Sequence, residues 1–114
     1  MEVAERDEPR GALDGIRVLD IAEPFGAYVS RILGDLGADV MKIEPPGGDP
    51  GRQMAPLLSV GAEQLSLPFV HANLNKRSII LDVHQPQDQE RFRALARQAD
   101  VVVSTEGVAA YAPG

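Results

Sequence analysis

Two adjacent cations, Lys76 and Arg77, stand directly before an apolar run and are the first candidates for binding an anion. An arginine grips a phosphate through a fork of N–H donors, whereas a lysine acts as a point charge. A second interpretation has equal weight on spacing alone: the two cations mark a solvated strand entrance or form ion pairs with Asp82 or Glu44. The residue types therefore indicate either a phosphate site or an ordinary strand entrance.

Other polar residues stand where a nucleotide site would need them, but their pattern is incomplete. A dinucleotide site needs Gly-x-Gly-x-x-Gly after its first strand, so that the backbone can approach the pyrophosphate. The matching segment here, Glu23-Pro24-Phe25-Gly26-Ala27, has one glycine and a carboxylate, although Glu44 stands where an acid would hold a ribose hydroxyl. Asp82 and His84 share one face of a strand end, where a histidine is more often a surface residue than a ligand. This pattern disfavours NAD, and the chain has neither a Walker loop nor a Gly-x-Ser-x-Gly nucleophile motif.

Four short apolar runs predict the buried parallel strands that would position these side chains. Each is rich in β-branched residues and is bounded by glycine, proline or polar residues. The runs are residues 16–22, 40–44, 78–83 and 101–104. In open α/β sheets ligands bind at the carboxyl ends of the strands, so the irregular loop from Gly47 to Gly51 lies where a ligand is expected.

Apolar stripes with spacings of three and four residues predict the helices that connect the strands. One helix follows the first strand, opened by Pro24 and closed by a left-handed cap at Gly37. Another begins at Gln85–Asp88, and a short helix is expected near Leu67–Leu74 inside the ambiguous segment Ala55–Leu74. The resulting order of β-α-β, loop and β-α-β predicts a Rossmann-like α/β fold, with a mostly parallel sheet and flanking helices.

Composition narrows the function classes further. Of the 114 residues 44% are apolar but only 4% are aromatic, so the core is built from aliphatic side chains. The absence of cysteine excludes disulfides, thiol catalysis and zinc sites of the cysteine type. A net charge of −6 without a basic stripe disfavours nucleic acid as a partner. No signal peptide or apolar run of membrane-spanning length is recognisable, which predicts a cytoplasmic protein without membrane association.

The charge distribution also predicts the domain organisation. Residues 1–14 carry five acidic residues against two arginines and are interpreted as a mobile acidic tail. Residues 15–114 are predicted to form the amino-terminal part of one Rossmann-like domain.

Several motifs are more specific together than apart. They lie in segments 13–20, 33–46, 48–52, 75–82 and 99–103, and include Leu33-Gly34-Asp35-Leu36-Gly37-Ala38-Asp39-Val40-Met41-Lys42-Ile43-Glu44-Pro45-Pro46 and Asn75-Lys76-Arg77-Ser78-Ile79-Ile80-Leu81-Asp82. In order and spacing they resemble the amino-terminal part of the family III CoA-transferases. This family includes formyl-CoA and carnitine CoA-transferases and the α-methylacyl-CoA racemases.

The resemblance implies an interlocked homodimer whose Rossmann-like large domain binds CoA. It implies acyl-CoA and a carboxylate acceptor as substrates, with no prosthetic group and no metal. Contacts to CoA then fall on the loops at the strand ends, and the two cations before the third strand remain candidates. The candidate CoA-binding residues are Phe25, Gly26, Arg52, Lys76, Arg77, Leu81, Val83, His84, Thr105 and Gly107.

The catalytic residues implied by the resemblance lie downstream of the matching segments. In the transferases an aspartate becomes a covalent CoA thioester, and in the racemases an acid and a base exchange the α-proton. No aspartate of this chain falls in the matching context, so no catalytic residue is assigned.

We therefore expect the CoA-binding portion of a transferase, inactive by itself. The corresponding part of a racemase and a non-catalytic nucleotide-binding module are the alternatives. Two local departures from the family pattern concern the CoA pocket. Thr105-Glu106 stands where many members have Asn-Phe, and Pro45 where some have arginine.

Overall fold

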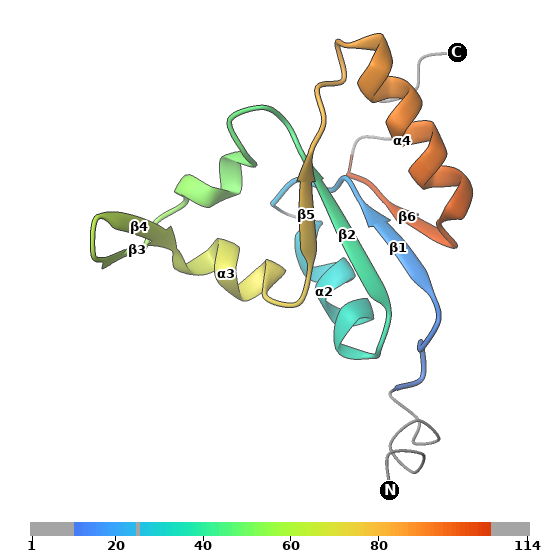
Figure 1. Ribbon diagram of the computed structural model, residues 1–114. Helices are drawn as coiled ribbons and strands as arrows, with labels where there is room; N and C mark the ends of the chain where they lie inside the picture. The colour runs from blue at the N-terminus through green and yellow to red at the C-terminus, as the bar shows by residue number, and fades with distance from the viewer. Residues whose placement is uncertain (1–10, 25, 106–114) are drawn as a thin grey trace, which may run out of the picture.

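The computed structural model describes residues 11–24 and 26–105, and its centre is a four-stranded parallel sheet (Figure 1). The strands are β1 (Arg17–Asp20), β2 (Asp39–Glu44), β5 (Arg77–Ile80) and β6 (Val101–Val103). Their order across the sheet is β5-β2-β1-β6, which is 3-2-1-4 when these four strands are numbered along the chain. Doubly wound folds have this order, and their ligands bind where it reverses, here between β1 and β6. The four predicted strands and the parallel α/β class are confirmed.

Two helices cover opposite faces of this sheet. Helix α2 (Ala27–Asp35) connects β1 to β2, and helix α4 (Pro86–Gln98) connects β5 to β6. Side chains alternate between the faces along a strand, so neighbouring residues of β1 belong to different core clusters. Leu19 packs with Phe92 of α4, whereas Val18 packs with Leu33 of α2. None of the helices in the described ranges is long and apolar enough to cross a membrane.

Helix α2 has the predicted position, but its predicted apolar stripe is mostly exposed. Among the described residues of that stripe (Tyr28, Val29, Ile32, Leu33 and Leu36), Leu33 is the one that packs against a core cluster. Ala27 and Ser30 are its buried residues, while Val29 and Ile32 of the stripe are 54% and 44% exposed. The helix begins at Ala27 and not at Pro24, which lies in the preceding turn. Its end is as predicted, because Gly37 has a φ of +109° in the region that favours glycine.

The segment that was ambiguous in the sequence contains a hairpin that the pattern did not predict. Strands β3 (Leu57–Val60) and β4 (Glu63–Ser66) pair antiparallel and expose every residue except Ser66. Such strands lack the alternation of apolar and polar residues on which strand prediction depends. The predicted short helix is confirmed as α3 (Leu67–Asn73).

The loop after β2 is more regular than the sequence indicated. Residues Pro50–Gln53 form the short 3₁₀ helix η1, where only irregular turns were expected up to Gly51. The Asp49 side chain caps this helix by accepting a hydrogen bond from the Gly51 backbone N–H at 2.6 Å. A proline at the first position favours such a helix, because the backbone N–H of that position would have no carbonyl partner within the helix and its absence costs nothing.

The ordered contacts begin before the predicted domain boundary at residue 15. Leu13 packs against the core cluster of Val18, Ala38 and Val40, and its backbone N–H donates to the Leu36 carbonyl at 2.9 Å. The predicted acidic tail otherwise falls on residues 1–10, which lie outside the described ranges.

Candidate functional site

The carboxyl ends of the four parallel strands surround a cleft of about 520 Å³. Each strand contributes the residues that follow it, and the loop after β2 adds a further wall. Among the lining residues are 21–23 after β1, 82–84 after β5, Ser104 and Thr105 after β6, and Pro45, Pro46, Asp49 and Pro50 after β2. The cleft therefore lies at the edge of the sheet where parallel α/β folds bind their ligands.

Three predicted CoA-binding residues line this cleft: Val83, His84 and Thr105. Leu81 is 4% exposed and belongs to the core beneath it. Phe25 and Gly107 lie outside the described residues.

Gly26 lies where the loops after β1 and β6 approach each other. A Cβ atom added there would be 2.6 Å from Thr105 Cγ2 and 2.9 Å from Ala22 Cβ. The Thr105 hydroxyl also accepts a hydrogen bond from the Glu23 backbone N–H at 3.2 Å. A side chain at Gly26 would force these two loops apart, so we interpret this glycine as a packing requirement of the cleft.

The cleft combines apolar walls with carboxylates. Its described lining contains Glu23, Asp49 and Asp82 and no lysine or arginine, and His84 is the one titratable base among these residues. Asp82 accepts a hydrogen bond from the His84 backbone N–H at 3.0 Å, which fixes the loop after β5. The cationic phosphate grip expected from Lys76 and Arg77 is therefore not part of this described lining.

Lys76 points into the interior and forms a buried ion pair with Asp20. Its Nζ lies 2.7 Å from Asp20 Oδ2 and donates to the Ala27 carbonyl at 2.7 Å and to Asn73 Oδ1 at 2.8 Å. The side chains of Lys76 and Asp20 are 1% and 0% exposed. Burial lowers the pKa of the Lys76 ammonium, and the hydrogen bond that Lys76 donates to Asp20 opposes that shift. The alternative that paired this lysine with Asp82 or Glu44 named the wrong partner, since Lys76 pairs with Asp20.

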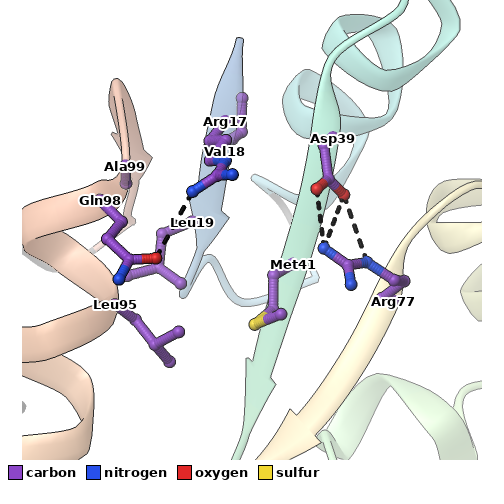
Figure 2. A pocket seen from close by; sticks show the side chains of 9 residues that line it. All are labelled: Arg17, Val18, Leu19, Asp39, Met41, Arg77, Leu95, Gln98 and Ala99. Carbon is purple, nitrogen blue, oxygen red and sulfur yellow. Dashed lines mark hydrogen bonds and ion pairs between the residues drawn. The ribbon is translucent and has the colours of Figure 1, made fainter. Parts of the chain in front are cut away.

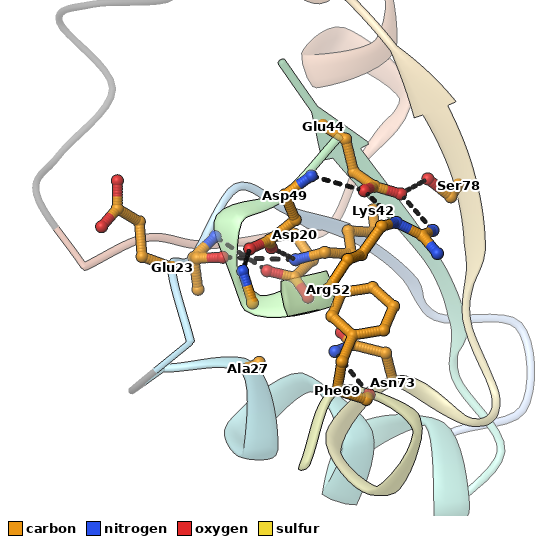
Figure 3. A network of polar contacts seen from close by, with 12 residues as sticks. Asp20, Glu23, Ala27, Lys42, Glu44, Asp49, Arg52, Phe69, Asn73 and Ser78 are labelled. Atoms are coloured by element: carbon orange, nitrogen blue, oxygen red, sulfur yellow. Dashed lines mark hydrogen bonds and ion pairs between the residues drawn. The ribbon is translucent and has the colours of Figure 1, made fainter. Parts of the chain in front are cut away.

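A second buried pair joins Lys42 of β2 to Asp49 in the loop that follows (Figure 3). The Nζ of Lys42 lies 2.6 Å from Asp49 Oδ2, and the two side chains are 1% and 7% exposed. Buried charges persist when they are paired and their remaining hydrogen-bonding capacity is used. Both conditions hold for Asp49, whose other oxygen accepts from the Gly51 N–H.

Arg52 holds Glu44 through a fork of two donors and lies against an aromatic ring (Figure 3). Its Nε and Nη2 donate to the two carboxylate oxygens at 2.6 and 2.7 Å, and its Cζ is 4.3 Å from the centre of the Phe69 ring. Ser78 donates a further hydrogen bond to Glu44. The fork from Arg52 is the main cause that lowers the pKa of Glu44 from 4.5 to about 2.

The contacts between Arg52 and Glu44 change the functional interpretation of both residues. Glu44 is 2% exposed and its oxygens are occupied, so it cannot hold a ribose hydroxyl as the NAD alternative required. Arg52 forms an ion pair with Glu44, which links the loop after β2 to the end of that strand, and it is not part of the described cleft lining. Its predicted contact with CoA stays a prediction.

Arg77 starts β5 and therefore lies at the opposite edge of the sheet from the cleft. Figure 2 shows it beside Asp39. Arg77 is in register with Met41, and its guanidinium pairs with Asp39 at 2.7 Å. Both side chains of this pair are at least half exposed, and they border a separate hollow of about 370 Å³ beside α4. The structure therefore does not bring Arg77 together with Val83, His84 and Thr105.

The buried charges Asp20, Lys42 and Asp49 were not proposed as site residues from the sequence. A signal for two of them was present, because Asp20 and Lys42 each stand between apolar residues in a run that predicts a buried strand. A charge inside a buried strand needs a partner of opposite sign, and this rule marks both positions. It does not identify the partners, which come from distant segments of the chain.

Known proteins that resemble this chain agree on one family. The family model described as CoA-transferase family III matches residues 13–111. Succinyl-CoA:mesaconate CoA-transferase of Haloarcula hispanica is 45% identical over 95 residues, which cover 82% of this chain and 24% of that protein. Succinate–glutarate CoA-transferase of Agrobacterium fabrum is 41% identical over 107 residues, 87% of this chain and 27% of that protein.

A solved structure gives the same result. A crystal structure of a CaiB/BaiF family protein from Brucella suis matches with a TM-score of 0.77 and 37% identity. The match covers 84% of this chain and 26% of that one. The chain thus spans about a quarter of the length of these relatives.

The Glu44 carboxylate predicts a specific loss of stability in acid. Its pKa is about 2 in the folded chain and 4.5 ordinarily, so its contribution is complete above pH 4.5 and is lost as the pH falls toward 2. That contribution is about 3 kcal/mol, of which about 2 kcal/mol is gone by pH 3. Urea unfolding at pH 6 and pH 3 measures the difference. The Glu44→Gln variant lacks the titrating group, so its free energy of unfolding should fall by about 2 kcal/mol less between pH 6 and pH 3. Equal losses of stability in parent and variant would contradict this account.

The adjacent residues Lys76 and Arg77 predict opposite sensitivities. Lys76→Met leaves the Asp20 carboxylate buried without its countercharge and should lower the free energy of unfolding by about 3–5 kcal/mol. Arg77→Met removes an exposed pair and should cost less than about 1 kcal/mol. Urea denaturation at neutral pH measures both. Asp20→Asn in the Lys76→Met background should recover part of the loss, and similar costs for the two single variants would refute the distinction.

Proposed function

The chain belongs to CoA-transferase family III, and we propose that it is the CoA-binding portion of an enzyme that transfers CoA between carboxylic acids. The resemblance predicted from the sequence is thereby confirmed at the level of the family. One observation carries the proposal: the 520 Å³ cleft lies at the carboxyl edge of a parallel sheet, beside the reversal of strand order. Two relatives are named for transfers that involve succinate or succinyl-CoA, which supports carboxylates and their CoA thioesters as the substrate class.

The apolar walls and the carboxylates of the cleft favour an uncharged part of CoA as its occupant. Pro45, Pro46, Pro50 and Val83 give it apolar walls, whereas its charged lining residues are mostly carboxylates. Carboxylates repel phosphates, and apolar walls favour an aromatic ring or an alkyl chain. The proposal therefore places the adenine ring or the pantetheine chain against these walls, with the phosphates directed away from Glu23 and Asp82. Val83, His84 and Thr105 are the proposed contacts.

The chemistry proposed for the complete protein follows the family mechanism. An aspartate outside this chain attacks the acyl-CoA thioester, and the resulting mixed anhydride is cleaved by the CoA thiolate, which leaves an aspartyl-CoA thioester and the free acid. A second carboxylate then takes the CoA by the same two steps in reverse, so the nucleophile divides a difficult exchange into easier steps. In this proposal the chain supplies binding and orientation, is inactive by itself and works within a cytoplasmic homodimer.

Calorimetric titration with CoA, with adenosine diphosphate as the smaller comparator, tests the proposed site. The parent chain should bind CoA saturably, and Val83→Glu should weaken binding about tenfold, because it adds a carboxylate to an already acidic cleft. Gln98→Glu adds the same charge at the hollow on the opposite edge of the sheet and is the matched control, expected to leave the affinity within about twofold. Equal effects of the two substitutions, or no binding by a folded parent, would count against the cleft as the CoA site.

A further inference from the structure

We propose that Lys42 is a positioning residue that sets the separation of the two loops on either side of the cleft. The inference rests on the proposed CoA-binding function of the cleft and adds to it the residue that keeps the cleft in shape. Lys42 does not belong to the cleft lining, and its side chain is 1% exposed. It acts through the residues that it contacts.

One ammonium group contacts both walls. The Nζ of Lys42 lies 2.6 Å from Asp49 Oδ2, in the loop after β2, and 3.4 Å from the Ala22 carbonyl oxygen, in the loop after β1. Ala22 and Asp49 both line the cleft. Lys42 therefore connects the two walls from beneath, through one strong charged contact and one weaker hydrogen bond.

The loops after β1 and β2, which form these two walls, are each hydrogen-bonded to the strand that precedes them. Lys42 therefore connects two loops that are each already fixed to a strand. The Ala22 N–H donates to Asp20 Oδ1 at 2.8 Å, and the Asp49 N–H donates to Glu44 Oε1 at 2.8 Å. These contacts fix each loop relative to its own strand. The bridge through Lys42 differs from them because it links one loop to the other.

The neighbouring pair of Lys76 and Asp20 explains why Lys42 pairs with Asp49. Lys76 lies on the same face of the sheet and neutralises Asp20, so Asp20 does not compete with Asp49 for Lys42. The set contains two cations and two anions, each paired and at most 7% exposed. A buried Asp49 carboxylate without Lys42 would keep only the Gly51 N–H and would gain by turning toward water. Asp49 lines the cleft, so an Asp49 side chain that turned toward water there would distort this wall.

The test separates affinity for CoA from stability of the fold. Lys42→Met keeps an unbranched side chain and removes the donors; the variant is compared with Asp49→Asn and with Lys42→Met/Asp49→Asn. CoA affinity is measured calorimetrically at a temperature where circular dichroism shows every variant folded. We expect Lys42→Met to lower the melting temperature and to weaken CoA binding about ten- to hundredfold, since small misplacements of a site are costly.

The double variant decides between a positioning role and a merely structural one. Replacing Asp49 by Asn removes the uncompensated charge, so the double variant should regain much of the melting temperature. It should not regain the affinity, because the contact with Ala22 is still missing. Affinity that returns together with stability would overturn the positioning role, as would parent-like affinity in folded Lys42→Met. Arg97→Met, which breaks an exposed pair with Glu90 on α4, is the matched control and should bind CoA like the parent.

A measurement without ligand keeps this inference distinct from the proposed function. Backbone amide resonances of Ala22, Glu23 and Asp49 are compared between Asp49→Asn and the double variant, which differ only at residue 42. If Lys42 couples the loops, the Ala22 and Glu23 resonances shift as well as that of residue 49; unchanged Ala22 and Glu23 resonances overturn the coupling. A parent chain that binds no CoA while these resonances shift together would contradict only the proposed function.

Discussion

Charge pairing on one face of the sheet is the constraint on which the rest of this structure depends. Asp20 and Lys42 lie on the same face of β1 and β2 as Val18 and Val40, whose apolar cluster packs against α2. A buried charge is tolerated only with a partner of opposite sign, so Lys76 and Asp49 must reach them from other segments. The loop before β5 and the loop after β2 are thereby tied to the middle of the sheet.

The same constraint explains the unusual packing of α2. Ser30 donates to Asp20 Oδ2 at 2.6 Å, and the Ala27 carbonyl accepts from Lys76, so the side of the helix that faces the sheet is small and polar. Most of its larger apolar residues are left outward, with Val29 and Ile32 about half exposed, whereas Leu33 packs against Val18. The opposite face of the sheet has no such charges and forms an ordinary aliphatic core around Phe92. The face toward α4 thus supplies apolar packing, and the face toward α2 combines an apolar cluster around Val18 and Val40 with the polar contacts that hold the strand-end loops.

The strands and the end of α2 could be predicted from the sequence because they depend on neighbouring residues. The ion pairs could not, because their partners come from distant segments of the chain. Four short apolar runs identified the strands, and Gly37 identified the end of α2. The different environments of Lys76 and Arg77 could not be predicted from such local patterns. The two residues are adjacent in sequence, yet one is buried with Asp20 and the other is exposed with Asp39, since successive residues point to opposite sides of a strand. The cleft itself was predicted from the carboxyl-end rule, whereas the ion pairs that support it needed the three-dimensional structure.

Binding of CoA in the cleft at the carboxyl edge of the sheet is the proposal on which the other functional assignments rest. Changes in the backbone amide resonances of the ¹⁵N-labelled chain on addition of CoA are its sharpest test. On titration with CoA, the account predicts the largest shifts in residues after the strands, such as Glu23, Val83 and Thr105. Residues at the opposite edge, such as Asp39 and Arg77, should shift little. Shifts concentrated around Asp39 and Arg77 instead would show that the ligand prefers the other hollow and would contradict the assignment of the cleft.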